Sequence, residues 1–248
     1  MMQKMIIDGK KIAEEIISGL QGNYTLGVVM DEGNAASQSF VRIKERIATK
    51  VGVKILRYSA EDFDKAAACD GMIVQLPIAN ADDLLAKIPP EKDVDALGPN
   101  PLVLSPVAEA IAEVLVRANV SARGKQAVVV GAGRLVGAPA KALLEDVGAV
   151  VSVVTESRGS LDELEDADIV VLGAGSPGIV KPEMLKPGVV LIDAGTSEQG
   201  GKVAGDADPR CAEVASVFTP VPGGIGPIAV AMIFKNLFTL AQKQSLPK

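Results

Sequence analysis

Histidine is absent from all 248 residues of this chain. Its absence excludes the serine–histidine and cysteine–histidine arrangements that activate nucleophiles, and it excludes metal sites with histidine ligands. Any proton transfer near neutral pH must therefore use lysine, aspartate, glutamate, cysteine, tyrosine or bound water. Such a chain suits chemistry in which a bound cofactor carries the difficult step.

Cysteines and long apolar segments are also scarce. Only Cys69 and Cys211 are present, and their spacing does not fit a metal site. We therefore expect a reduced, cytoplasmic protein without structural disulfides or zinc. Residues 1–8 contain no long apolar stretch, and we expect no run elsewhere to be long enough to cross a bilayer.

Aromatic residues make up only 3% of the chain, although 48% of it is hydrophobic. The core must then be built from valine, isoleucine, leucine and alanine, which is typical of buried parallel strands covered by helices. The net charge is −6, and no lysine- or arginine-rich run interleaves with aromatic residues. Nucleic acid and anionic membranes are therefore not expected as partners.

Apolar residues alternate between helical and strand spacing along the whole chain. This alternation predicts a two-domain α/β protein, with a Rossmann-like, doubly wound parallel sheet in its second half. A polar stretch at 119–125 marks the expected hinge between an N-terminal catalytic domain at 1–118 and a nucleotide-binding domain at 119–227. The tail at 228–248 is expected to be helical and to pack back on the first domain. Expected helices cover 10–20, 37–51, 81–88, 106–118, 136–147 and 228–242, and expected strands cover 26–30, 53–58, 72–76, 126–130, 150–154, 168–172, 189–192 and 216–219.

Three glycines follow the expected strand at 126–130: Gly131, Gly133 and Gly137, with Arg134 among them. Glycines in the first turn after a strand let backbone N–H groups reach a pyrophosphate at the N-terminus of the following helix. The third glycine comes one residue later than the G-x-G-x-x-G spacing requires. The order of strand, glycines, helix and strand favours a dinucleotide site over a turn that only packs the helix on the sheet.

The end of the next expected strand carries Glu156, Ser157 and Arg158. An acidic residue there commonly accepts hydrogen bonds from the ribose hydroxyls of NAD, whereas serine and arginine can hold the extra phosphate of NADP. Both types of residue are present. At this point NAD, NADP and a plain solvated loop are all open.

Three polar residues outside the glycine loop are candidates for chemistry or ligand recognition. Lys44 lies one helical turn after Phe40, so both project from the same helix face. A lysine held near an apolar face has its charged form disfavoured and can act as an acid or base, but the charged neighbours of Lys44 favour a solvated surface group. Gln75 ends a buried strand and Asp95 follows a turn, and each can contact a ligand or only complete the local structure.

Residues 218–227 read Phe-Thr-Pro-Val-Pro-Gly-Gly-Ile-Gly-Pro. Proline fixes φ and glycine permits positive φ, so this run predicts a rigid, shaped turn at the end of a strand. Such a turn lets the main chain approach a flat ligand closely. An isolated Pro-Gly-Gly, in contrast, favours a tight connection without a ligand.

Four segments in the same order resemble the methylenetetrahydrofolate dehydrogenase/cyclohydrolase family. They are 36–44 (ASQSFVRIK), 71–77 (GMIVQLP), 92–95 (KDVD) and 219–227 (TPVPGGIGP). Residues 7–10 and 174–178 fit the same family. The resemblance therefore covers essentially the whole chain.

This resemblance implies a two-domain enzyme of one-carbon metabolism, typically a homodimer joined through its nucleotide domains. It would oxidise 5,10-methylenetetrahydrofolate by hydride transfer to NADP and then hydrolyse the methenyl product to 10-formyltetrahydrofolate. The resemblance implies that Lys44 is the catalytic lysine, that Gln75 assists it and that Asp95 holds the pterin ring. The residues implied to line the substrate cleft are Phe40, Pro222, Gly223 and Gly224, and those implied to bind the cofactor are Gly131, Gly133, Arg134, Gly137, Glu156, Ser157, Arg158 and Gly175.

Phe40 stands where the family usually has tyrosine, so a hydroxyl is missing near the lysine. We therefore expect dehydrogenase activity to exceed cyclohydrolase activity. NAD is the alternative cofactor, because Glu156 would repel the extra phosphate of NADP. Two other functions stay open: a dehydrogenase for a related pterin one-carbon carrier, and a nucleotide-binding regulatory protein without catalysis. The presence of Lys44, Gln75 and Asp95 together argues against the regulatory protein.

Overall fold

The computed structural model describes residues 4–199 and 202–244, which form two compact units. Residues 4–12, 107–199 and 202–229 form the six-stranded unit, and residues 13–106 and 230–244 form the three-stranded unit, each named after its main sheet. The expected α/β class, with two domains and a Rossmann-like parallel sheet, is confirmed. The division differs from the expected boundary at 118, because residues 4–12 and 107–118 group with the six-stranded unit. The last four residues of the expected C-terminal tail, 245–248, lie outside the described residues.

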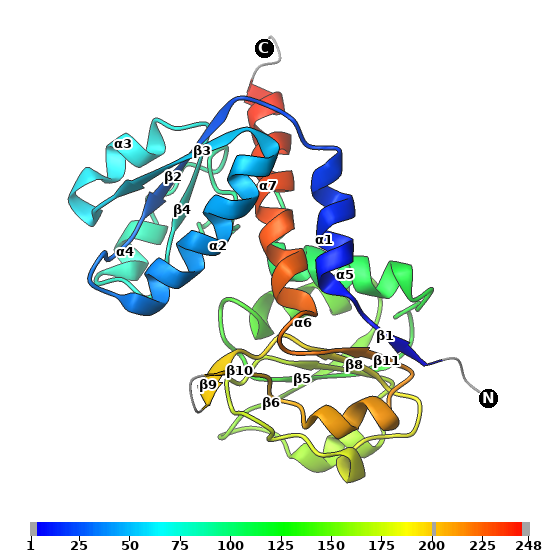
Figure 1. The fold of residues 1–248 in the computed structure, drawn as a ribbon. Helices are drawn as coiled ribbons and strands as arrows, with labels where there is room; N and C mark the ends of the chain where they lie inside the picture. Colours follow the sequence, from blue (N-terminus) through cyan, green and yellow to red (C-terminus); the bar gives the residue numbers. More distant parts are fainter. Residues whose placement is uncertain (1–3, 200–201, 245–248) are drawn as a thin grey trace. The chain divides into compact units, whose positions relative to one another are not determined.

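The sheet of the six-stranded unit consists of β1 (Met5–Ile6), β5 (Gln126–Val130), β6 (Val150–Val154), β7 (Ile169–Leu172), β8 (Val190–Asp193) and β11 (Val217–Thr219). Its order is β1-β11-β8-β7-β5-β6, and all neighbouring strands run parallel (Figure 1). The inner strands are runs of valine, isoleucine and leucine, as expected for strands covered on both faces. β1 pairs with β11, with Met5 opposite Val217. This pairing explains why the start of the chain belongs to this unit.

Helices and short 3-10 segments cover the six-stranded sheet. They are α5 (Pro106–Arg117), α6 (Gly137–Asp146), η2 (Leu161–Glu165), η3 (Pro182–Met184) and η4 (Pro209–Glu213). α6 packs against β5, β6 and β7. On one face, Val170 and Leu191 of the sheet share a buried core with Leu164 and Cys211 of the 3-10 segments. A short antiparallel pair, β9 (Ser197–Gln199) and β10 (Lys202–Ala204), extends from this unit.

The three-stranded unit is a second parallel sheet with helices on both faces. Its strands are β2 (Tyr24–Val29), β3 (Val53–Tyr58) and β4 (Gly71–Val74), in the order β3-β2-β4. Its helices are α1 (Gly9–Ser18), α2 (Ala35–Val51), η1 (Ala60–Asp62), α3 (Phe63–Ala67), α4 (Ala81–Leu85) and α7 (Ile225–Gln244). Because side chains alternate along a strand, Leu26 and Val28 pack with α1, α2 and α7, while Val29 packs with α3 and α4.

α7 corrects one expectation from the sequence. By length and composition alone, this helix is long and apolar enough to cross a membrane, with a mean hydropathy of 1.4. The expectation that no run in the chain is long enough to cross a bilayer is therefore wrong. However, 67% of its apolar window is buried inside the protein, where Phe234 and Leu237 pack with the strands of the three-stranded unit. This burial is typical of a core helix.

Candidate active site

Lys44 lies on the buried face of α2. The helix begins after Asn34, whose Oδ1 accepts the Ser37 N–H at 2.9 Å, and it ends at Gly52, which has a φ of 74°. Buried positions recur at helical spacing, at Ser37, Val41, Lys44, Ala48 and Val51. Lys44 is only 6% exposed. The interpretation of this lysine as a solvated surface group is therefore wrong, because the phase of the helix turns it inward.

Gln75 holds the Lys44 amine. Lys44 Nζ donates to Gln75 Oε1 at 2.7 Å. The backbone N–H of Gln75 donates to Val29 O at 2.8 Å, which continues the strand pairing past the end of β4. Its side-chain Nε2 donates to Leu76 O at 2.9 Å. Because the amide donor is engaged by a main-chain carbonyl, the amide oxygen is left to face the lysine.

Asp95 completes this group. It is half-buried, and its carboxylate interacts electrostatically with Lys44. Burial lowers the pKa of the Lys44 ammonium, and the Asp95 carboxylate opposes that shift. Burial raises the pKa of the Asp95 carboxyl, while the charge of Lys44 opposes this rise and the charge of Asp93 adds to it. The three residues thus form one electrostatically coupled group in the three-stranded unit.

Two residues that were not predicted from the sequence hold the turn that carries Asp95. Asp93 is 1% exposed and accepts the Gly98 N–H at 2.7 Å. Asn236 on α7 is also 1% exposed, and its Nδ2 donates to Val94 O at 3.1 Å. A buried amide needs such a partner. An asparagine within the apolar part of α7 is the sequence signal that could have indicated this role.

Phe40 lies one turn before Lys44 and is 44% exposed. Ile43, which neighbours it on the helix surface, is 42% exposed. α2 therefore presents apolar surface next to its buried amine. An exposed aromatic ring in this position is available to a flat ligand.

The three glycines after β5 have different roles. Gly131 has a φ of 100°, and a Cβ there would lie 2.4 Å from the Gly173 carbonyl oxygen. A Cβ on Gly137 would lie 2.1 Å from the Gly131 carbonyl oxygen. Around Gly133, in contrast, the described residues leave open space for a Cβ, and Arg134 beside it is exposed. Gly131 and Gly137 thus permit close packing, whereas Gly133 leaves room for a ligand.

This glycine loop lies where the strand order of the sheet reverses. β5 has β6 on one side and β7 on the other. In doubly wound sheets, ligands bind outside the carboxyl ends of the strands at such a point. The Gly131 N–H donates to Val154 O of β6 at 2.8 Å, and the Gly173 N–H after β7 donates to Val130 O at 2.8 Å. These bonds hold the ends of β5, β6 and β7 next to one another at the loop.

A tight turn after β6 carries the residues predicted for the ribose end of the nucleotide. The Thr155 N–H donates to Arg158 O at 2.7 Å and the Arg158 N–H donates to Thr155 O at 3.3 Å, so Glu156 and Ser157 form the tip. Glu156, Ser157 and Arg158 are all exposed. The bond from Gly131 to the last residue of β6 places this turn next to the glycine loop.

Gly175 lies in the loop after β7, with a φ of 69°. Its N–H donates to Asp206 Oδ2 at 3.1 Å, and its carbonyl accepts a hydrogen bond from Ser197 Oγ at 2.8 Å. Both backbone polar groups are therefore engaged within the protein. What Gly175 contributes is therefore the shape of the loop.

The predicted proline-glycine turn follows β11. The Gly224 N–H donates to Pro220 O at 2.7 Å and closes the turn, in which the Val221–Pro222 peptide bond is cis. Gly223 has a φ of 110° and an added Cβ there would meet open space, whereas Gly224 is buried. The Gly9 N–H donates to Gly223 O at 2.8 Å. The start of α1 therefore packs directly on the turn.

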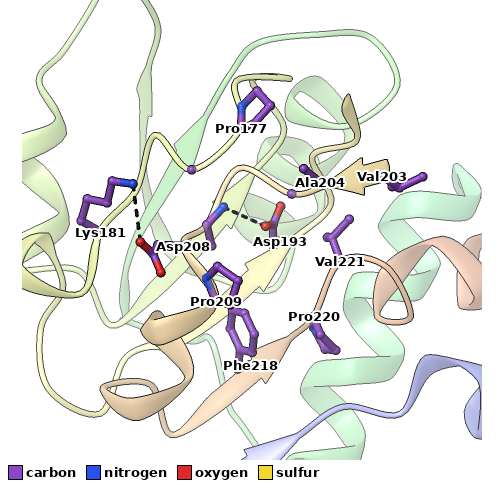
Figure 2. A pocket seen from close by; sticks show the side chains of 13 residues that line it. Pro177, Lys181, Asp193, Val203, Ala204, Asp208, Pro209, Phe218, Pro220 and Val221 are labelled. Atoms are coloured by element: carbon purple, nitrogen blue, oxygen red, sulfur yellow. Dashed lines mark hydrogen bonds and ion pairs between the residues drawn. The ribbon is translucent and has the colours of Figure 1, made fainter. Parts of the chain in front are cut away.

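A cavity of about 380 Å³ lies beside the ends of β8 and β11 (Figure 2). Val221 of the proline-glycine turn lines it, as does Asp193, which is 1% exposed. Burial raises the pKa of Asp193 to about 6, although its Oδ2 accepts the Ala207 N–H at 2.9 Å. Lys181 Nζ lies 3.5 Å from Asp208 Oδ2 on the same wall. Asp193, Lys181 and Asp208 were not predicted as site residues from the sequence, because they share no local motif.

Known proteins resemble this chain over nearly its full length. The family described as tetrahydrofolate dehydrogenase/cyclohydrolase, NAD(P)-binding domain, matches residues 105–245. A protein of Staphylococcus aureus named bifunctional protein FolD is 33% identical over 280 residues, which covers 98% of each chain.

Two solved structures share the fold. The bifunctional FolD methylenetetrahydrofolate dehydrogenase/cyclohydrolase of Campylobacter jejuni has a TM-score of 0.89 at 27% identity, and the match covers 97% of this chain and 99% of that one. The methylenetetrahydrofolate dehydrogenase-cyclohydrolase of Trypanosoma brucei, complexed with NADP cofactor and inhibitor, has a TM-score of 0.87 at 29% identity and full coverage of both chains. This chain belongs to the tetrahydrofolate dehydrogenase/cyclohydrolase family.

Proposed function

We propose that this protein oxidises 5,10-methylenetetrahydrofolate to 5,10-methenyltetrahydrofolate by hydride transfer to NADP, and that it hydrolyses the product to 10-formyltetrahydrofolate more slowly. The observation that carries the proposal is the buried Lys44–Gln75 hydrogen bond with Asp95 beside it. An unreactive nucleotide-binding protein has no need for a buried amine held by an amide.

Hydride transfer depends mainly on alignment of the methylene carbon with the nicotinamide. We assign Asp95 to the pterin ring, because a half-buried carboxylate can accept hydrogen bonds from ring N–H groups. We assign the exposed ring of Phe40 to the apolar body of the substrate. The substrate-binding proposal also includes Pro222, Gly223 and Gly224, because this turn is rigid and open at Gly223.

Hydrolysis needs a proton acceptor as well. Water adds to the cationic methenyl carbon, and a proton must leave that water. Burial lowers the pKa of Lys44, which increases its neutral, proton-accepting fraction at a given pH. Gln75 Oε1 holds the amine at 2.7 Å and thus orients it. We therefore assign Lys44 as the base and Gln75 as its orienting partner.

We place the proposed nucleotide site at the ends of the strands in the six-stranded unit. The glycine loop would hold the pyrophosphate, with Gly131 and Gly137 shaping it, Gly133 leaving space and Arg134 adding positive charge. The turn after β6 would hold the ribose end, and Gly175 would form the facing loop. In this proposal Glu156 accepts from the ribose, while Ser157 and Arg158 hold the extra phosphate of NADP.

Replacing Arg158 with alanine is expected to raise the dissociation constant for NADP about tenfold and to leave that for NAD nearly unaltered, because only NADP offers a phosphate to the guanidinium. Calorimetric titration with both nucleotides measures the effect. Arg123→Ala, at another exposed arginine of the same unit, is the matched control and should change neither constant. An equal loss for both cofactors rules out this role for Arg158.

Replacing Phe40 with tyrosine is expected to raise the hydrolysis rate by about three- to tenfold, the worth of one added hydrogen bond to the lysine or the water. The ring is 44% exposed, so a hydroxyl can be accommodated without burying a polar group. Rates of methenyltetrahydrofolate hydrolysis and of NADP reduction are compared, and only the first should rise. Phe40→Leu controls for changes in packing. If tyrosine and leucine give the same hydrolysis rate, the hydroxyl has no such role.

A spectrophotometric assay of the purified protein with methylenetetrahydrofolate, using NADP and NAD in parallel, tests the whole proposal. Reduction of NADP in preference to NAD supports it. Activity with another pterin carrier alone would favour a dehydrogenase for that carrier. Nucleotide binding without any turnover would favour a regulatory protein.

We further propose a homodimer joined through the six-stranded unit, as the family resemblance implies. β6 is an edge strand of that sheet, and Val150 on it is 57% exposed. An unpaired edge with exposed apolar residues is a ready surface for a second copy. A cytoplasmic location is also part of the proposal, supported by the two free, buried cysteines.

A further inference from the structure

Asp206 is a buried carboxylate to which the reaction proposed above gives no role. It is 0% exposed. Its Oδ2 accepts the N–H groups of Ala174 at 2.7 Å and Gly175 at 3.1 Å, and its Oδ1 accepts the Ser176 N–H at 2.7 Å. Three consecutive N–H groups of one loop therefore point at one carboxylate. Hydrogen bonds to an ionised acceptor are about twice as strong as neutral ones, so this side chain dictates the shape of the loop.

The loop that Asp206 holds touches the glycine loop. It begins at Gly173 after β7, and a Cβ on Gly131 would lie 2.4 Å from the Gly173 carbonyl oxygen. A Cβ on Gly173 itself would lie 2.3 Å from a methyl carbon of Val136, the residue before α6. The loop thus forms the β7 side of the point where the strand order reverses. A shift of residues 174–176 would change the space left for a dinucleotide there.

The surroundings of Asp206 keep the carboxylate in place. The main chain is held by bonds from the Gly178 N–H to Gly205 O at 3.0 Å and from the Val180 N–H to Asp206 O at 3.1 Å. Gly195 leaves the necessary room, since a Cβ there would lie 2.3 Å from Asp206 Cγ. Ser197 Oγ donates to Gly175 O at 2.8 Å. The loop is therefore held by a buried carboxylate through its N–H groups and by a hydroxyl through a carbonyl.

We propose that Asp206 is a positioning residue for the nucleotide, which fixes residues 174–176 in the conformation that binds NADP without itself touching the cofactor. This inference rests on the proposed function, since it names a further determinant of the same nucleotide site. Asp206 would act on the nucleotide indirectly, through the loop, whereas the exposed residues of the site would contact the cofactor directly.

The test is NADP affinity in Asp206→Asn, measured by calorimetric titration at a temperature where parent and variant are both fully folded. Asparagine offers one acceptor oxygen and places an NH₂ group against N–H groups of the loop, so at least one bond is lost and one contact becomes repulsive. The dissociation constant for NADP is expected to rise about tenfold or more. Methenyltetrahydrofolate hydrolysis is expected to stay within about twofold, because it consumes no nucleotide and its assigned residues lie in the three-stranded unit.

Asp208→Asn is the matched control. This carboxylate lies two residues further along, but it pairs with Lys181 at 3.5 Å (Figure 2). It also pairs with Arg210 at 2.8 Å. The variant should therefore bind NADP like the parent. Ser197→Ala removes the other side-chain hydrogen bond to the same loop, at a partly exposed position, and should weaken NADP binding about threefold.

The outcomes separate positioning from a role in stability alone. A lower melting temperature of Asp206→Asn with an unchanged dissociation constant would show that the carboxylate only stabilises the fold, and the inference would be overturned. Equal loss of NADP binding and hydrolysis would also overturn it. If Asp206→Asn does not fold, parent-like affinity in Ser197→Ala decides against the inference. Absence of NADP binding by the parent would defeat the proposed function itself.

Discussion

Replacing Lys44 with methionine is expected to lower methenyltetrahydrofolate hydrolysis by about 100-fold or more, while hydride transfer falls much less. Methionine keeps a long apolar side chain in the buried site but has no amine to accept a proton from water. Hydride transfer depends on alignment, which Asp95 and the nucleotide site provide in our proposal. Separate assays of NADP reduction and of methenyl hydrolysis measure how much each rate falls in the variant.

Lys50→Met is the matched control for this prediction. Lys50 lies on the same helix but is 60% exposed and 3.9 Å from Glu14, so its replacement should alter neither rate. Hydrolysis by Lys44→Met at the parent rate, above the uncatalysed background, would refute the assignment of Lys44 as the base.

The pH dependence of hydrolysis reports on the same lysine. Burial lowers the pKa of Lys44 from its ordinary value of 10.5, and the Asp95 carboxylate opposes this shift. Since the neutral amine accepts the proton, the rate constant should rise with pH and level off above a pKa that lies below 10.5. The Lys44→Met variant should lose this rise. A rising limb that persists in the variant would assign the titration to another group.

Replacing Gly133 with valine is expected to abolish the increase in melting temperature that NADP gives to the parent. A ligand that binds only the folded state stabilises it by about 2.7 kcal/mol at 100 times its dissociation constant. The added side chain would meet open space in the protein itself, so the fold should persist while the space of the pyrophosphate is filled. Thermal unfolding with and without NADP measures the shift.

Substitutions at two other glycines serve as comparisons for this prediction. Gly19→Val also places its side chain in open space, but at the end of α1 in the three-stranded unit, and it should keep the full shift. Gly137→Ala should instead destabilise the protein without nucleotide, because its Cβ would lie 2.1 Å from the Gly131 carbonyl oxygen. An unchanged NADP shift in a folded Gly133→Val variant would place the nucleotide elsewhere.

The sequence determined the class of fold and most of its elements. Periodicity placed β3 at 53–58 and β5 at 126–130 with the bounds that the structure shows, because the residue pattern that favours a strand lies within its own short length. Glycines and prolines marked the loop at 131–137 and the turn at 220–224 because their backbone preferences are local. The family could be recognised from the order of such local motifs.

Only the tertiary structure decided what depends on residues far apart in the chain. The charged neighbours of Lys44 suggested a surface position, yet the helical spacing of α2 turns it inward and Gln75, directly after β4 and 31 residues away, accepts a hydrogen bond from its amine. Asp206 meets the loop at 174–176 across about thirty residues, with no motif to announce it. β1 is two residues long, and its pairing with β11 assigns the start of the chain to the six-stranded unit. Local periodicity specifies which segments form helices and strands, whereas the surroundings that set a pKa or hold a loop exist only after distant segments have packed together.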